Sequence, residues 1–270
     1  MAVSIAVLSL KGGTGKTTTV RTLTDVLRRV GLDVVAVDLD PQGNLSDYFD
    51  VPADAAPTVA DVLAGNAKAK AAIHGGIMPA SPILAEVERS LSGKMGRELV
   101  LRKALKETRK SHDVILIDCP PALGLLTING LVAADWALIS SEAQYFALQG
   151  VEGALEVVSQ AKEYYNDDLE FLGVVLNIAD MRTVHSREAF ESLKDHFGDK
   201  VFETVIRSSI AYAESAERAR SILDHRPDLG ADYLQLADEI LERVDLPAPR
   251  RKLKKLIAEA APAPSPAAAE

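Results

Sequence analysis

Three glycines, two lysines and three threonines fall within eight residues near the start of the chain. Glycine lets the backbone turn its N–H groups toward phosphate oxygens, and a helix that begins directly after such a turn adds a partial positive charge. Lys16 is placed to reach the β- and γ-phosphates, and the Thr17 hydroxyl is placed to ligate Mg²⁺. The segment therefore predicts a phosphate loop that binds ATP with Mg²⁺. Its residues are Lys11, Gly12, Gly13, Thr14, Gly15, Lys16, Thr17 and Thr18.

Two carboxylates follow apolar segments farther along the chain. Asp118 ends the apolar run 114–117, and an acid there can hold a Mg²⁺-bound water, because Mg²⁺ keeps most of its waters in protein sites. Asp40 follows a second apolar run and would lie beside the same phosphate loop, which suits in-line attack of a water on the γ-phosphate. Aspartates after strands also cap helices and form turns, but we favour the functional interpretation for both. For Asp38, inside the second run, a structural role and a magnesium-linked role remain open.

These loops depend on the elements before and after them for their positions. Short apolar segments alternate with longer helical stretches, which indicates an α/β fold with a doubly wound, mostly parallel sheet flanked by helices. Ligands in such sheets bind beyond the carboxyl ends of the strands, so all three loops should lie at one edge. Strands are expected over 3–9, 33–39, 114–117, 135–141 and 171–176. Helices are expected over 16–30, 148–165 and 184–197, in much of 50–110, and as a pair in 212–245.

The composition bounds the class of protein. Of the 270 residues, 47% are apolar, no run approaches the roughly 18 apolar residues of a membrane span, and the first residues lack a secretory-signal pattern. Cys119 is the single cysteine, which excludes a disulfide framework and a cysteine-rich metal site within one chain. We therefore expect a soluble, cytoplasmic protein with one ATPase domain over residues 1–246. Residues 247–270 are expected to form a basic and then Ala/Pro-rich tail that is flexible and disordered.

The phosphate loop departs from the general pattern in one respect. The general pattern has glycine six positions before the lysine, where this chain has Leu10, and Lys11 stands ahead of the glycines instead. This KGGxGKT variant resembles the deviant Walker A P-loop NTPases, which include ParA, MinD, the nitrogenase iron protein and arsenical pump ATPases. The segments VDLDPQGN and LIDCPPALGLLTINGL closely resemble ParA (Soj-like) partition ATPases, and the resemblance extends over residues 1–245. The iron protein shares an iron–sulfur cluster between cysteines, which the lone Cys119 cannot supply.

The resemblance implies roles for several residues. Lys11 would cross to the nucleotide of a second subunit in an ATP-bound homodimer, acting like an arginine finger, and would be catalytic together with Lys16 and Asp40. Asp40 would position the attacking water, and Thr17 and Asp118 would serve the metal. Asn177 would contact adenine, although a capping asparagine is the alternative there. Arg207 would lie over the base, but the proline that usually precedes it in the family is absent.

DNA contact is a further implication of the resemblance. ParA proteins bind DNA without sequence preference in the ATP state, through cations on late helices, and a ParB-like adaptor stimulates their otherwise slow ATP hydrolysis on the nucleoid. A net charge of −9 argues against nucleic-acid binding, but cations cluster late in this chain. Ala211 and Asp228 stand where the family often has basic residues. The candidates are Arg218, Arg220, Arg226, Arg250 and Arg251, with ordinary solvated charges as the alternative.

Two competing functions are also consistent with the sequence. Leu253, Leu256, Ile257 and Ala260 recur at helical spacing opposite a basic face, as in a MinD-like ATPase that cycles on a membrane. This stripe is short and has no aromatic anchor, so a tail that touches DNA or is solvated is favoured, and a membrane is not an expected partner. The second alternative is a module that binds nucleotide without turnover. The sequence does not indicate whether the cargo is a chromosome, a plasmid or a protein assembly.

Overall fold

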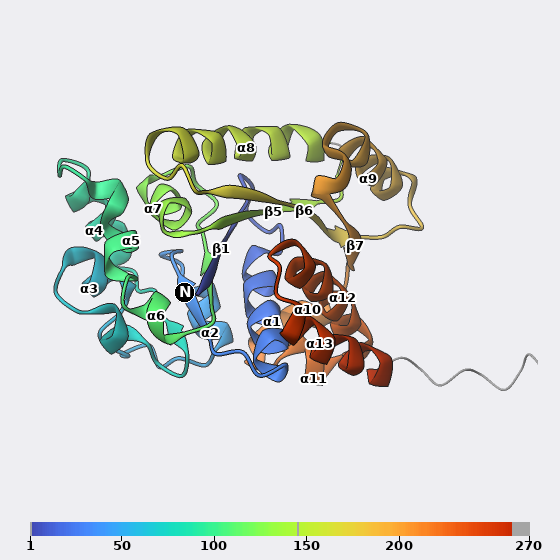
Figure 1. Cartoon of the computed structure of the whole chain (residues 1–270), viewed down its shortest axis with the longest axis horizontal. Coiled ribbons are helices and arrows are strands. Elements are labelled where there is room, and N and C mark those ends of the chain that lie inside the picture. Colours follow the sequence, from blue (N-terminus) through green and yellow to red (C-terminus); the bar gives the residue numbers. More distant parts are fainter. Residues whose placement is uncertain (1, 145, 261–270) are drawn as a thin grey trace, which may run out of the picture.

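A parallel β-sheet forms the centre of the computed structural model, which describes residues 2–144 and 146–260, without the side chains of 259 and 260 (Figure 1). Within these residues the sheet has seven strands in the order β3-β2-β4-β1-β5-β6-β7, and each neighbouring pair is parallel. The predicted doubly wound α/β class is confirmed. The strands are β1 Val3–Leu8, β2 Val34–Asp38, β3 Ile77–Met78, β4 Val114–Asp118, β5 Trp136–Glu142, β6 Glu170–Ala179 and β7 Val201–Arg207.

Helices cover both faces of this sheet (Figure 1). Helices α3, α4, α5, α7, α8 and α9 bury apolar side chains on one face, and α1, α11, α12 and α13 do so on the other. The helices are α1 Lys16–Arg29, α2 Asn44–Tyr48, α3 Val59–Ala64, α4 Leu84–Leu91, α5 Val100–Ala104, α6 Thr108–Ser111, α7 Leu125–Ala133, α8 Ala147–Tyr164, α9 Val184–Phe197, α10 Ala211–Glu217, α11 Ile222–His225, α12 Pro227–Arg243 and α13 Pro247–Ala260, with short 3-10 turns at Ala69–Ala72, Arg97–Leu99 and Gly198–Lys200.

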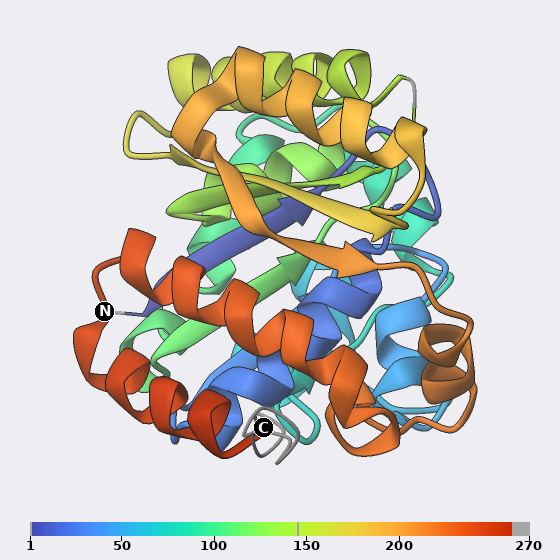
Figure 2. The same cartoon turned by 90° about the vertical axis from the view of Figure 1, so that its right-hand side faces the viewer.

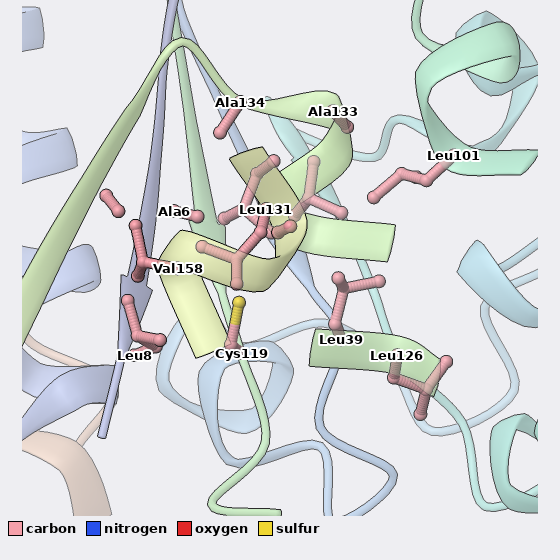
Figure 3. Close-up of a cluster of buried hydrophobic side chains, with 14 of the residues drawn as sticks. Ala6, Leu8, Leu39, Leu101, Cys119, Leu126, Leu131, Ala133, Ala134 and Val158 are labelled. Carbon is pink, nitrogen blue, oxygen red and sulfur yellow. The ribbon is translucent and has the colours of Figure 1, made fainter. Parts of the chain in front are cut away.

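Cys119 belongs to the first of these two apolar layers. Its side chain is fully buried, and Figure 3 shows it among Leu39, Leu131 and Val158. A Cβ atom built on Gly130 in α7 would lie 2.7 Å from the Cys119 sulfur, so α7 can approach the end of β4 only because that residue is glycine. The cysteine therefore serves packing behind the strand that ends at Asp118.

Three elements differ from the sequence-based expectations. The strand β3 lies in a segment that was expected to be helical, and it is only two residues long. Two residues are too few to show the periodicity of a strand. The strand β7 was not expected, because at the sheet edge it mixes buried, half-buried and exposed residues, unlike the continuous apolar runs of the central strands. Residues 211–243 form three helices rather than two, because the chain bends at Arg218–Ser221 and Pro227 begins a new helix.

The expected flexible tail is helical and packed over its described part. Residues 247–260 form α13, which lies beside α12 (Figure 2). Leu253 is fully buried, Leu256 and Ile257 pack on the same core, and Arg250 pairs with Asp238 at 3.0 Å and with Glu242. These three residues of the apolar stripe thus face the domain and explain why the helix docks, while the side chain of Ala260 lies outside the described part. Residues 261–270 lie outside the described residues.

Candidate functional site

The three predicted loops meet at one edge of the sheet. Strands β2, β4 and β1 are neighbours, so the segments that leave their carboxyl ends lie side by side. Asp38 and Asp118 are register partners, and the Thr17 hydroxyl donates a hydrogen bond of 2.7 Å to Asp118 Oδ2. The structure therefore brings together the phosphate loop and both acidic segments, as the parallel topology predicts.

The phosphate loop has the backbone conformation that its glycines permit. Gly13 and Gly15 have φ angles of 76° and 83°, in the left-handed region, and Gly15 caps the start of α1. The loop is also held from two other strands. Ser140 Oγ donates to the carbonyl oxygen of Thr14 at 2.7 Å, and Asn177 Nδ2 donates to Ser140 Oγ at 2.6 Å. Strands β5 and β6 thus fix the loop from behind.

Lys16 lies inside the site with an incompletely compensated charge. Only 7% of the residue is exposed, and its Nζ donates to the carbonyl oxygen of Lys11 at 3.3 Å. Burial lowers the pKa of Lys16, and the nearby carboxylates of Asp118 and Asp40 oppose that effect. A triphosphate would supply the missing negative charge, because its oxygens can replace the lost hydration of the ammonium group.

The residues around Asp118 fit a Mg²⁺ ion bound with a nucleotide. Its Oδ1 atom is buried and has no hydrogen-bond partner among the described residues. Burial and the neighbouring Asp38 raise the pKa of Asp118, and burial likewise raises that of Asp38. The described residues include no group of three or more His, Cys, Asp or Glu side chains that could hold a metal alone. One unpaired carboxylate oxygen beside a threonine hydroxyl suits Mg²⁺, which takes few protein ligands.

Asp38 and Asp40 have different environments. Asp38 is fully buried and accepts hydrogen bonds from the amide and the hydroxyl of Ser46 at 2.9 and 2.7 Å, so it anchors the start of α2. It also accepts from the amide of Asp40 at 3.1 Å. Asp40 itself is partly exposed and lines the central cavity. Of the two roles left open for Asp38, the contacts favour the structural one, whereas Asp40 lines the cavity.

A cavity of about 750 Å³ extends from the phosphate loop to α10. Asn177 lines it beside Gly15, but its amide nitrogen is occupied by Ser140 and, at 3.4 Å, by Thr19. Arg207 lines the far end, where its Nε lies 2.9 Å from Asp232 Oδ2. The two predicted base contacts thus border one cavity, and both are already engaged with the protein. Whether they touch a base stays a prediction.

Lys11 points away from the cavity of its own subunit. Its Nζ lies 2.7 Å from Glu142 Oε2 and 2.6 Å from Gln144 Oε1, at the end of β5. The side chain is 60% exposed. Lys16 lines the cavity together with the glycines of the phosphate loop and Lys11 does not, so Lys16 is the lysine positioned for a nucleotide in this cavity.

The candidate DNA contacts do not form one cluster of available charge. Arg226 pairs with Asp228 at 2.8 Å, Arg220 donates to the carbonyl oxygen of Asp224 at 3.0 Å, and Arg250 is compensated by two acids of α12. Apart from Arg220, which donates to a carbonyl oxygen, the exposed late cations that have no ion pair with a described carboxylate lie at the end of α10 and along α13. These are Arg218, Arg251, Lys252, Lys254 and Lys255.

Several residues that shape the site carry no motif in the sequence. Tyr212 and Tyr233 line the cavity with rings 6.1 Å apart, and Tyr48 lines it from α2. Glu142 and Gln144 hold Lys11. No local pattern marks these residues, because tertiary packing brings them to the site from α2, β5, α10 and α12. The sequence offers one general signal: ligands bind beyond the carboxyl ends of apolar strands, and Glu142 lies at such an end.

The fold and the site together define a P-loop ATPase of the deviant Walker A type. A protein-family profile described as an AAA domain matches residues 2–171. Over 245 residues the chain is 38% identical to the sporulation initiation inhibitor protein Soj of Bacillus subtilis, covering 87% of this chain and 97% of that protein. The chain belongs to the Soj/ParA family of partition ATPases. A chromosome-partitioning ATPase Soj of Thermus thermophilus is 36% identical, covering 89% of this chain and 96% of that protein.

A solved structure shares this fold and holds a nucleotide with magnesium. A Mycobacterium smegmatis protein described as cobyrinic acid a,c-diamide synthase, with bound ADP and magnesium, has a TM-score of 0.74 and 35% identity. The similarity covers 83% of this chain and 95% of that one. The expected cofactors, ATP and Mg²⁺, are thus consistent with the ligands of a similar structure and with the donor set around Asp118. No helix in the described residues is long and apolar enough to cross a membrane.

Proposed function

We propose that this chain is a partition ATPase that hydrolyses ATP to ADP and phosphate and works as an ATP-bound homodimer. In that state it binds duplex DNA without sequence preference and segregates or positions a cargo through a ParB-like adaptor. The observation that carries the proposal is the direction of Lys11, which leaves the phosphate loop away from its own cavity and is 60% exposed. A lysine so placed is available to the nucleotide of a second subunit.

Within each site the residues divide the chemistry. Lys16 binds the β- and γ-phosphates, and the loop amides around Gly13 and Gly15 cradle them. Thr17 and Asp118 would hold Mg²⁺, which supplies charge neutralisation on the phosphate oxygens when bound. Asp40, at the partly exposed wall of the cavity, orients the attacking water. Turnover is slow in this proposal until the adaptor and DNA complete the closed dimer.

The exposed cations of α13 are the proposed DNA-contacting surface, together with Arg218. Arg251, Lys252, Lys254 and Lys255 are exposed and unpaired among the described carboxylates, whereas Arg226 and Arg250 are compensated locally. Backbone phosphates require only accessible Lys or Arg. Two such surfaces in one dimer raise the affinity by avidity. The protein would accordingly act in the cytoplasm, on the nucleoid.

The contacts of α13 do not favour the membrane-cycling alternative. The residues that would enter a bilayer are Leu253, Leu256 and Ile257, and they pack against the domain core. Inserting them would require α13 to detach from α12 and expose that core. An amphipathic helix binds a bilayer through the apolar face that is buried here.

Retention on non-specific duplex DNA tests the proposal. The protein is incubated with ATP, ADP or neither, at low and moderate salt, in parallel with anionic liposomes and with a phosphate-release assay. We expect retention on DNA with ATP only, weakening steeply with salt. Lys16→Ala is the control, since it should bind neither nucleotide nor DNA. Retention on liposomes alone, or absence of phosphate release with any DNA, would contradict the proposal.

A further inference from the structure

Helix α10 lines the nucleotide cavity and is followed directly by Arg218. Ser215 of α10 shares a hydroxyl–hydroxyl hydrogen bond with Tyr48 of α2, the helix that follows Asp40. The two residues are 167 positions apart in the sequence. We propose that this bond couples α10 to the loop of Asp40, so that Ser215 and Tyr48 are positioning residues for hydrolysis. The proposal rests on the proposed function and concerns the regulation of that same site.

The α2 end of the connection is rigidly held. Tyr48 is the last residue of α2 and is only 2% exposed. Arg21, from the helix that follows the phosphate loop, donates to the carbonyl oxygen of Tyr48 at 2.9 Å, with its guanidinium 5.2 Å from the ring centroid. Two residues earlier in the same short helix, the amide of Ser46 donates to Asp38, which also accepts from the amide of Asp40. Movement of Tyr48 is therefore transmitted to Asp40 over one short, anchored helix.

The α10 end faces the nucleotide. Tyr212, Ala213 and Ala216 line the cavity, and Ser215 on the same short helix is fully buried. The Tyr212 hydroxyl is buried and has no hydrogen-bond partner among the described residues. A buried hydroxyl without a partner is unfavourable, so a ligand oxygen or nitrogen in the cavity would draw α10 toward it. Occupancy of the cavity thus changes the forces on the helix that holds Ser215.

The same helix leads to the proposed DNA-contacting surface. It ends at Glu217, and Arg218 follows directly and is exposed. Ala219 then has a φ angle of 47°, a left-handed conformation that is unusual for a residue other than glycine. Because α10 has only seven residues, a force on Arg218 reaches Ser215 within one turn. DNA bound at Arg218 and a nucleotide bound in the cavity therefore both act on the Ser215–Tyr48 hydroxyl pair, which connects to Asp40.

Ser215→Ala removes the hydroxyl from α10, and Tyr48→Phe removes its partner from α2. Each variant should lower the ratio of DNA-stimulated to unstimulated phosphate release by about fivefold, the lower end of typical coupling between sites. The double variant should lose no more than either single one, since both remove one bond. Ser215→Thr keeps a hydroxyl and should restore the ratio. Ser192→Ala, on the exposed side of α9, is the matched control and should behave as the parent.

Hydrogen exchange separates this proposal from the proposed function, because it needs no DNA. Residues 40–48 and α10 are compared with ADP and with a non-hydrolysable ATP analogue. In the parent and in Ser215→Thr, both segments should change protection together. In Ser215→Ala, α10 should still respond while the response of 40–48 falls by about fivefold. Parent-like responses of 40–48 in both Ser215→Ala and Tyr48→Phe, or no linked response in the parent, would overturn the coupling. Failure of the parent to bind DNA would instead contradict the proposed function alone.

Discussion

The Nζ atom of Lys11 lies 2.7 Å from Oε2 of Glu142, a carboxylate at the far end of β5. The exposed fraction is 60% for the lysine side chain and 19% for the glutamate side chain. Exposed ion pairs of this kind stabilise the folded state by about 0–1 kcal/mol. The lysine is thus held within its own subunit by an interaction weak enough to be exchanged for a triphosphate of a second subunit.

Glu142→Gln should release Lys11 for that exchange. We expect ATP-dependent dimerisation at concentrations about two- to fivefold lower than in the parent, since removal of an exposed ion pair is worth at most about 1 kcal/mol. Sedimentation velocity over a protein concentration series with ATP measures the shift. Glu107→Gln, which breaks the exposed 2.8 Å pair with Lys110, is the matched control. Weaker dimerisation of Glu142→Gln would show that the glutamate assists the dimer instead of restraining the lysine.

Asp40→Ala should bind ATP but hydrolyse it at least about 100-fold more slowly, because a positioned acid or base contributes at least that factor. The variant should therefore accumulate as an ATP-bound dimer. Light scattering on a sizing column, with ATP and then with ADP, follows the species. Asp47→Ala is a suitable control, since Asp47 lines the same cavity from α2. A purely monomeric Asp40→Ala protein in ATP would sink the proposed dimer switch.

The nucleotide-free protein should lose stability as pH rises above the ordinary pKa of aspartate, 3.8. Burial raises the pKa of Asp118 and Asp38, so the folded state binds more protons than the unfolded state there. Stability then falls with pH until both groups are ionised, by at most about 1.4 kcal/mol per pH unit for each group. Urea unfolding between pH 5 and 8 measures the slope. Asp118→Asn should flatten it, and an unchanged slope would contradict the assignment. Addition of Mg²⁺ and ADP should stabilise more at the higher pH.

The exposed cations of α13 should account for much of the DNA affinity. Arg251→Ala combined with Lys254→Ala should reduce affinity about tenfold or more. It should also lower the slope of log affinity against log salt by about 2, since each phosphate contact adds about 0.9. Fluorescence anisotropy with a labelled duplex across a salt series gives both quantities. Arg226→Ala, whose charge is paired with Asp228, should change the slope little. Equal effects of the two variants would place the contact outside α13.

How far the sequence predicts the structure depends on the kind of signal each feature carries. The places of the phosphate loop between β1 and α1 and of Asp118 at the end of β4 could be predicted, because a glycine-rich turn and an acid after a continuous apolar strand are local patterns. The packing of Leu253 could not, because an apolar stripe on a basic helix is the same whether it meets a bilayer or α12. The pairing of Lys11 with Glu142 was also hidden, since it joins residues 131 positions apart. Long-range side-chain contacts of this kind leave no periodic trace.

The buried position of Cys119 has a practical consequence for experiments on this protein. Burial raises the pKa of its thiol, so the group stays protonated and unreactive toward maleimides and iodoacetamides in the folded state. It is also the single cysteine of the chain. A cysteine introduced on the surface, for example at Ser192 or Lys255, would therefore be the one site that takes a dye or spin label. The natural sequence can be labelled at chosen positions without first removing a thiol.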